Sequence, residues 1–129
     1  MRGRKPPLQE DDEAIREVRP APDWLPEAAR GEWDRVLPLL VARRILTEAD
    51  IASLENYCLA VGQVRDAQLS ITQRGLTISN ARGTRVNPAL RIQAEAMTRS
   101  RLLAAELGLT PVSRSRRSMV GADDDDLLA

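Results

Sequence analysis

Residues 47–73 read TEADIASLENYCLAVGQVRDAQLSITQ, and this stretch decides the fold. Thr47, followed three residues later by Asp50, forms a variant of the capping box that begins helices, with Asp in place of the usual Glu or Gln. Because the stretch holds no proline and only one glycine, Gly62, it predicts one long helix over about 48–73. Its apolar residues recur at helical spacing as Ile51, Leu54, Cys58 and Val61, widened by Tyr57, Val64 and Ile71. A stripe this wide predicts contacts on two sides of the helix, and neighbouring subunits can provide one of them.

The sequence directly after this helix changes its period. Gly75 is expected to end the helix. Residues 76–86 then alternate apolar and polar side chains around the turn-prone residues 80–83, NARG. Alternation on both sides of such a turn predicts a short β-hairpin between helices.

A second long helix is expected to follow the hairpin. Asn87 and Pro88 form a good N-cap and first-turn pair, and apolar residues at helical spacing continue to Leu107. Gly108 is the expected C-cap. The helices over 48–73 and 89–107 can then fold back as an antiparallel pair, with the hairpin at the bend.

A shorter helix is expected before residue 47, beginning near Pro26, with Glu27 at the positive end of its dipole. Its apolar stripe is Trp33, Val36, Leu37, Leu40 and Val41. Pro38 cannot donate to the helical ladder, so we expect a kink or a break there, with a possible second piece reaching Arg44. Trp24, Trp33 and Cys58 are expected to be core or staple residues.

The fold class is therefore mainly α, with a hairpin between two antiparallel helices, an N-terminal helix and flexible termini. Residues 1–23 combine four prolines with many charges and predict a flexible or loosely docked arm. Residues 24–110 are expected to form a helical oligomerisation core with the hairpin near 76–86. Residues 111–129 predict a second flexible arm, first basic and then acidic.

Composition argues against several classes of protein. No stretch approaches the roughly 20 apolar residues that span a bilayer, and no apolar signal-peptide core follows Met1. We therefore expect a soluble protein that does not interact with a membrane. Cys58 is the only cysteine and there is no histidine, which excludes an intrachain disulfide and disfavours a zinc site. Without histidine the commonest general acid and base is also missing. We expect no catalytic residue, no metal and no cofactor.

The formal net charge of zero conceals a strong segregation of charge. Residues 74–117 hold nine arginines against two glutamates, whereas residues 1–73 hold ten basic and thirteen acidic groups. Eighteen of the nineteen basic residues are arginine, which suits phosphate contacts, although codon bias in a GC-rich genome explains the same preference.

Several short motifs, in this order and spacing, resemble one branch of the phage terminase small subunits from Gly3 to Arg117. They are Gly3-Arg4-Lys5-Pro6, Pro22-Asp23-Trp24-Leu25, Ile45-Leu46-Thr47-Glu48-Ala49-Asp50, Tyr57-Cys58, Gly75-Leu76-Thr77, Asn87-Pro88-Ala89, and Leu107-Gly108-Leu109-Thr110-Pro111 followed by Ser113-Arg114. The resemblance implies a homo-oligomeric ring of mostly helical protomers that binds double-stranded viral DNA in the host bacterial cytoplasm. It also implies a partner, the large terminase subunit, which carries the ATPase and the nuclease.

Charge arguments select the residues expected to contact DNA, in three groups. Arg2, Arg4 and Lys5 resemble an AT-hook core that follows the minor groove. Arg74, Arg82, Arg85 and Arg91 lie on or beside the hairpin, where guarding a strand edge against aggregation is the alternative role. Arg114, Arg116 and Arg117 lie in a serine-rich arm suited to phosphates or simply to solvation.

The acidic C-terminus is expected to bind the large subunit or to screen the arginines, although a solvated tail has the same composition. The residues concerned are Asp123, Asp124, Asp125, Asp126, Leu127 and Leu128.

Two other classes of protein remain open. A phage or prophage transcription regulator would use a helix-turn-helix over 43–58, but Glu48, Asp50 and Glu55 on its recognition helix would repel phosphate. A small nuclease would need Asp50 and Glu55 as metal ligands, yet five helical residues place them about 140° apart around the axis.

Overall fold

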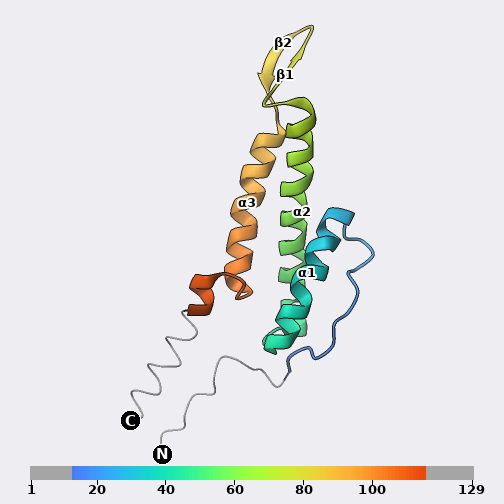
Figure 1. Cartoon of the computed structure of the whole chain (residues 1–129), viewed down its shortest axis with the longest axis vertical. Coiled ribbons are helices and arrows are strands. Elements are labelled where there is room, and N and C mark those ends of the chain that lie inside the picture. Colours follow the sequence, from blue (N-terminus) through green and yellow to red (C-terminus); the bar gives the residue numbers. More distant parts are fainter. Residues whose placement is uncertain (1–12, 116–129) are drawn as a thin grey trace, which may run out of the picture.

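The computed structural model describes residues 13–115, which form three helices and one β-hairpin. The elements are α1 (Glu27–Arg43), α2 (Ile51–Arg74), β1 (Thr77–Asn80), β2 (Gly83–Val86) and α3 (Ala89–Glu106). Figure 1 shows α2 and α3 side by side, the hairpin beyond their far end, and α1 against the lower half of α2. The predicted class, mainly α with an antiparallel helix pair and a hairpin at the bend, is confirmed.

The first helix begins where the sequence predicted, with Pro26 at the N-cap and Glu27 in the first turn. It ends at Arg44, whose φ of 55° lies in the left-handed region. Pro38 lies inside α1, yet the helix continues to Arg43, so no break occurs there. Burial of Leu37 and Leu40 on either side of Pro38 holds the helix together despite the missing backbone donor.

The predicted capping box at the start of the long helix is confirmed. The backbone N–H of Thr47 donates to Asp50 Oδ2 over 2.9 Å. The first turn, Glu48–Asp50, is a 3₁₀ helix, and α2 continues from it to Arg74. Gly75 ends α2 with a φ of 88°, a conformation that glycine adopts without steric cost.

The hairpin has the predicted turn, because Asn80 pairs with Gly83 and leaves Ala81 and Arg82 as the two turn residues. Asn87 caps α3 through its side chain, whose Oδ1 accepts from the backbone N–H of Ala89 over 2.9 Å. At the other end Gly108, with a φ of 75°, directly follows the C-cap residue.

The core lies where α1 crosses α2, near the end of α3. Trp33 is buried there, and its indole N–H donates to the Arg19 carbonyl over 2.9 Å. Cys58 is also fully buried, so both residues have the predicted core role. The prediction for Trp24 was wrong, because its side chain is 57% exposed. It lies in the turn before α1, and Leu25 fills the core position instead.

The described parts of both terminal arms have defined structure, and for residues 13–23 this is the docked alternative of the prediction. Residues 13–23 lie along the body, where Ile15 is buried and its N–H donates to the Leu46 carbonyl over 2.7 Å. Residues 111–115 form a helical turn in which Thr110 and Ser113 cap one another. In both places a few long-range or capping hydrogen bonds order a segment whose composition predicts little structure.

Within residues 13–115, no helix has the length and the apolar character needed to cross a membrane.

Candidate nucleic-acid interface

The upper part of the molecule, residues 66–97, is called the stalk here, and the rest of the described chain is called the body. The stalk contains the hairpin and the adjoining end of each of the helices α2 and α3 (Figure 1). Its seam is built from small or polar residues: Ala67, Ala89 and Ala96 are buried, and Gln93 donates to Gln68 and to the Val64 carbonyl. The two helices therefore approach closely but bury few large apolar side chains between them.

Asn87 fixes the base of the hairpin to both helices. Its side-chain amide donates to the Gly75 carbonyl over 3.0 Å, and its backbone N–H donates to the Leu76 carbonyl over 2.8 Å. With its Oδ1 on the N–H of Ala89, the buried Asn87 satisfies polar groups at the end of α2 and the start of α3. The hairpin is therefore held as a continuation of the helix pair.

The structure brings four of the predicted DNA-binding arginines to this end of the molecule. Arg74 ends α2, Arg82 is in the hairpin turn, Arg85 is on β2, and Arg91 is in the first turns of α3. The chain between Arg74 and Arg91 contains no Asp or Glu. The stalk tip is therefore a continuous basic segment.

The guanidinium groups of this tip differ in their pairing. Arg91 Nε donates to Glu95 over 3.2 Å. Arg74, Arg82 and Arg85 have no side-chain hydrogen bond or ion pair to any residue in 13–115. The hairpin turn is itself ordered by Asn80, whose Oδ1 accepts from the Arg82 N–H over 2.8 Å. A shallow hollow at this turn is lined by Asn80, Arg82, Gly83, Thr84 and Arg85.

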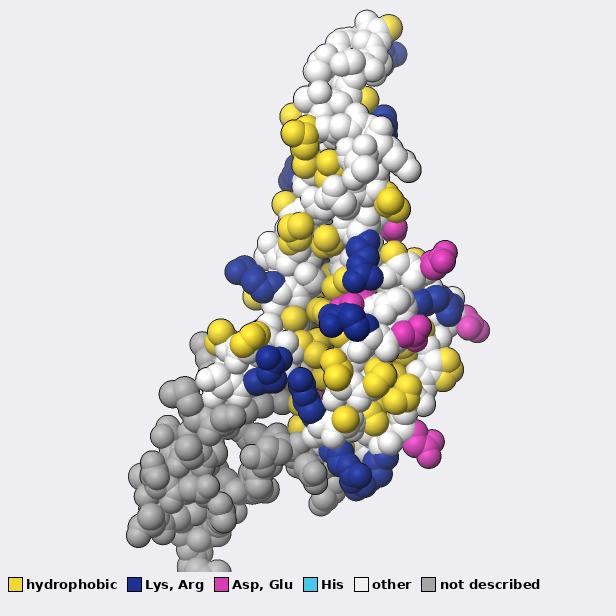
Figure 2. All heavy atoms as spheres, in the orientation of Figure 1, with side chains coloured by type: hydrophobic (Ala, Val, Ile, Leu, Met, Phe, Trp, Pro, Cys, Tyr) yellow, Lys and Arg dark blue, Asp and Glu magenta, His cyan; other side chains and the backbone are white. Residues whose placement is uncertain are grey.

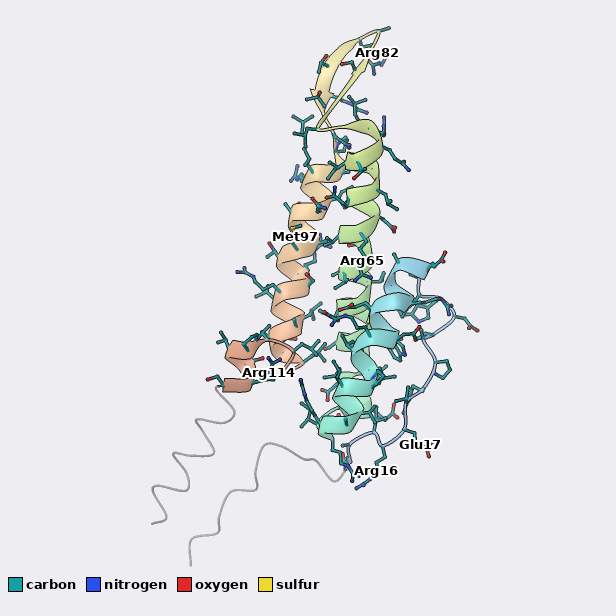
Figure 3. The ribbon with its side chains drawn as sticks, viewed as in Figure 1. Arg16, Glu17, Arg65, Arg82, Met97 and Arg114 are labelled. Carbon is teal, nitrogen blue, oxygen red and sulfur yellow. The ribbon has the colours of Figure 1, made fainter. Side chains whose placement is uncertain are left out.

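Arg114, also predicted to contact DNA, lies at the opposite end of the molecule from Arg82 (Figure 3). Its guanidinium donates to the Leu109 carbonyl over 3.0 Å, so part of its hydrogen-bonding capacity is used within the chain. The structure thus separates the described arginines of the prediction into two groups. The remaining predicted site residues lie outside the described part of the chain: Arg2, Arg4, Lys5, Arg116, Arg117, Asp123, Asp124, Asp125, Asp126, Leu127 and Leu128.

A buried charged cluster between α1 and α2 was not predicted from the sequence. Glu32 is 1% exposed and accepts hydrogen bonds from the Tyr57 hydroxyl and from Arg35, whose Nε and Nη2 lie 2.8 and 2.6 Å from its two oxygens. Arg65 Nη2 lies 3.7 Å from Glu32 Oε1. Glu32 sits three residues before Arg35, a common surface pair, whereas its third hydrogen-bond donor, Tyr57, comes from another helix.

This cluster shifts the pKa values of its members. Burial alone would raise the pKa of the Glu32 carboxyl, but the hydrogen bonds from Arg35 and Tyr57 outweigh it and lower the pKa. Burial and the bond to Glu32 both raise the pKa of the Tyr57 hydroxyl. Burial also raises the pKa of the nearby Cys58 thiol to about 12, so the thiol is uncharged at neutral pH.

Two further observations concern chemistry in the described residues. No group of three or more Cys, Asp or Glu side chains within 13–115 is arranged to hold a metal ion. The first half of α2, the recognition helix of the regulator hypothesis, buries Leu54, Tyr57 and Cys58 in the core. Glu48, which is exposed in the 3₁₀ turn before α2, forms an ion pair with Arg19 over 2.6 Å.

The comparisons with known proteins give one positive finding. A family model described as phage terminase, small subunit, matches residues 29–124, which is most of the chain. Neither the curated proteins nor the solved structures contain a match to this chain.

Proposed function

Because this chain belongs to the phage terminase small-subunit family, we propose that it forms a homo-oligomeric ring, binds double-stranded viral DNA and recruits the large terminase subunit. Membership of the family supports a role in DNA packaging, and small terminase subunits are generally not catalytic. The host bacterial cytoplasm is the proposed site of action.

The basic stalk tip is the observation that carries the DNA-binding part of this proposal. Arg82 and Arg85 lie on a hairpin fixed by Asn87, and Arg74 ends the adjoining α2; none of the three has an acidic partner among the described residues. Guanidinium groups of this kind bind phosphate oxygens and release counterions from the duplex, a sequence-independent interaction. A ring would repeat the tip in every protomer, so that weak contacts add through avidity.

The apolar surface of the stalk supports self-assembly. Its exposed large side chains are Leu69, Leu76, Val86, Ile92 and Met97. Ile92 also lines a shallow groove between α2 and α3 together with Ala67 and Ala89. A second copy of the chain would cover this surface, and the wide apolar stripe of α2 is the sequence feature that led to the same expectation.

The terminal segments have proposed roles of their own. We assign residues 24–110 to oligomerisation, and the charged residues near both ends of the chain to contacts outside the protomer. Arg2, Arg4, Lys5, Arg114, Arg116 and Arg117 would add phosphate contacts. The acidic run from Asp123 to Asp126, with Leu127 and Leu128, would bind the large subunit.

The test compares Arg82→Gln with Arg16→Gln, which removes the same charge from an exposed residue of the body that has no partner in 13–115. We expect Arg82→Gln to weaken duplex binding several-fold at low salt. It should also reduce the dependence of log K on log salt by about 0.9 for each phosphate group that the variant no longer binds.

Native mass spectrometry of the wild-type protein accompanies the binding test. A single discrete assembly larger than a dimer is expected. A monomer would contradict the ring. Equal DNA affinity of both variants and the wild type would contradict the contact of the stalk tip with DNA.

A further inference from the structure

Two arginines of the body share a single carboxylate. Arg35 from α1 and Arg65 from α2 both form ion pairs with Glu32. We propose that these two guanidinium groups form a second phosphate-binding site, on the body, that holds the backbone of duplex DNA. The proposal rests on the DNA-binding function proposed above and adds a contact away from the stalk tip.

Glu32 already accepts three hydrogen bonds without Arg65. Arg35 binds both of its oxygens in a bidentate pair, and the Tyr57 hydroxyl donates to one of them. Arg65 Nη2 remains 3.7 Å away, an ion-pair distance at which no hydrogen bond forms. Within residues 13–115, no acceptor takes a hydrogen bond from the Arg65 guanidinium.

The three charged groups Glu32, Arg35 and Arg65 together carry one net positive charge. Two guanidinium groups face one carboxylate, which leaves one positive charge without a counter-charge in the cluster. Asp34 and Asp66 are adjacent in sequence to Arg35 and Arg65, but neighbours one apart on a helix do not face each other. An anion that brings its own acceptors would therefore satisfy both the charge and the unused donors.

Both side chains are accessible to a large ligand. The Arg35 and Arg65 side chains are 60% and 54% exposed, while Glu32 beneath them is buried. Arg65 lies across α1 at Gly31, where an added Cβ would be 3.8 Å from Nη1. Figure 3 places Arg65 at the crossing of α1 and α2, and Figure 2 shows dark blue side chains at the same place on the visible face.

The geometry of the two guanidinium groups favours phosphate as their ligand. The bidentate pair with the buried Glu32 orients Arg35, so this side chain loses little freedom on binding. The planar fork of a guanidinium matches two oxygens of a phosphate, whereas an ammonium offers only a point charge. Arg65 offers its unused fork to such a phosphate, and Arg35 offers the N–H groups that do not bind Glu32.

Arg65→Gln is the decisive variant, because Arg65 makes no hydrogen bond that folding requires. Arg16→Gln is the matched control for loss of one positive charge, and Arg65→Lys keeps the charge without the fork. We measure affinity for a duplex at several salt concentrations, with the complete chain. Thermal unfolding of each variant accompanies the binding curves.

The expected result is a several-fold loss of affinity for Arg65→Gln, beyond that for Arg16→Gln, with a smaller salt dependence and an unchanged unfolding midpoint. Arg65→Lys keeps the positive charge, so its salt dependence should lie closer to that of the wild type than that of Arg65→Gln does. Its affinity should recover less, because lysine lacks the planar fork.

Equal binding by Arg65→Gln and Arg16→Gln would overturn the site while leaving the proposed function intact, provided that Arg82→Gln is weakened. Absence of duplex binding by the wild-type protein would reject the proposed function itself, and the body site with it.

Discussion

The body and the stalk are built from the same pair of helices, yet they bury different side chains. In the body, α1 covers α2, and the buried set includes Trp33, Leu37, Leu40 and Leu54. In the stalk, α2 faces only α3, and the buried apolar side chains are alanines. Large apolar residues such as Leu69 and Ile92 remain exposed there.

The difference follows from the number of helices that meet. Two helices in contact bury one stripe each, so a wide stripe such as that of α2 needs a third element. The body supplies this element as α1, from the same chain. We infer that the body supplies the stability of the isolated protomer, and that the stalk presents surface for other molecules.

The largest expected effect on stability comes from shortening a leucine side chain to alanine in the body, compared with the same substitution in the stalk. Leu37 is 0% exposed, and Leu37→Ala should lower the free energy of unfolding by about 2–5 kcal/mol, because it removes buried apolar surface and leaves a cavity behind. Leu69 is 58% exposed, and Leu69→Ala should change it by about 0.5 kcal/mol or less in the protomer. Chemical denaturation at low protein concentration measures both, and equal losses would abolish the distinction between the two regions.

A second prediction concerns the charged cluster that joins α1 to α2 within the body. Glu32→Gln keeps the shape but replaces charge-assisted hydrogen bonds from Arg35 and Tyr57 by weaker ones. It should therefore cost about 1–3 kcal/mol of unfolding free energy at pH 7. The exposure of Arg35 favours the lower part of this range, since water can solvate its released guanidinium.

The stabilisation by ionised Glu32 should depend on pH, and the direction follows from the shift of its pKa. The folded state lowers the pKa of Glu32 from its ordinary value of 4.5, so the stabilisation is present above that value and is lost as the pH falls through the lower, folded pKa. The difference between wild type and Glu32→Gln should therefore shrink on acidification below about pH 4.5. A difference that stays constant from pH 7 to pH 3 would show that the cluster does not act through the ionised carboxylate.

Sequence predicted those parts of the fold that local chemistry determines. Pro26, the Thr47–Asp50 capping box, Gly75 and Asn87 each act on backbone groups within a few residues, and each has the predicted role. The exposed position of Trp24 was missed because Trp24 and Leu25 are adjacent apolar residues before α1, and the sequence does not show which of them is buried. The sequence left two alternatives open for residues 13–23, a flexible or a loosely docked arm, because the docking depends on the distant carbonyl of Leu46.

The same distinction between local and long-range features holds for the candidate site. Charge counting found the basic hairpin, because its arginines are consecutive in a segment without acidic residues. It did not find the Arg35–Glu32–Arg65 cluster, since the two arginines are 30 residues apart and residues 1–73 as a whole carry a net negative charge. The only sequence signal was a glutamate at position 32 directly before Trp33 on an otherwise apolar helix face.

The smallest expected effect concerns two glycines that test how closely α1 approaches α2 in the body. A Cβ on Gly62 would lie 2.9 Å from the backbone nitrogen of Ala29, and backbone cannot move aside as a side chain can. A Cβ on Gly31 would meet only the end of the Arg65 side chain, at 3.8 Å. Both residues are helical, so alanine gains about 0.5–1 kcal/mol of helix propensity at either position.

At Gly62 this gain is opposed by overpacking of about 1–3 kcal/mol, so Gly62→Ala should be destabilising by about 1 kcal/mol overall, whereas Gly31→Ala should be stabilising. Thermal unfolding of the two variants against the wild type separates these signs. Stabilisation by Gly62→Ala would mean that α1 can move away from α2 at little cost. The body would then resemble the stalk, since its helices would also lack a closely fixed partner.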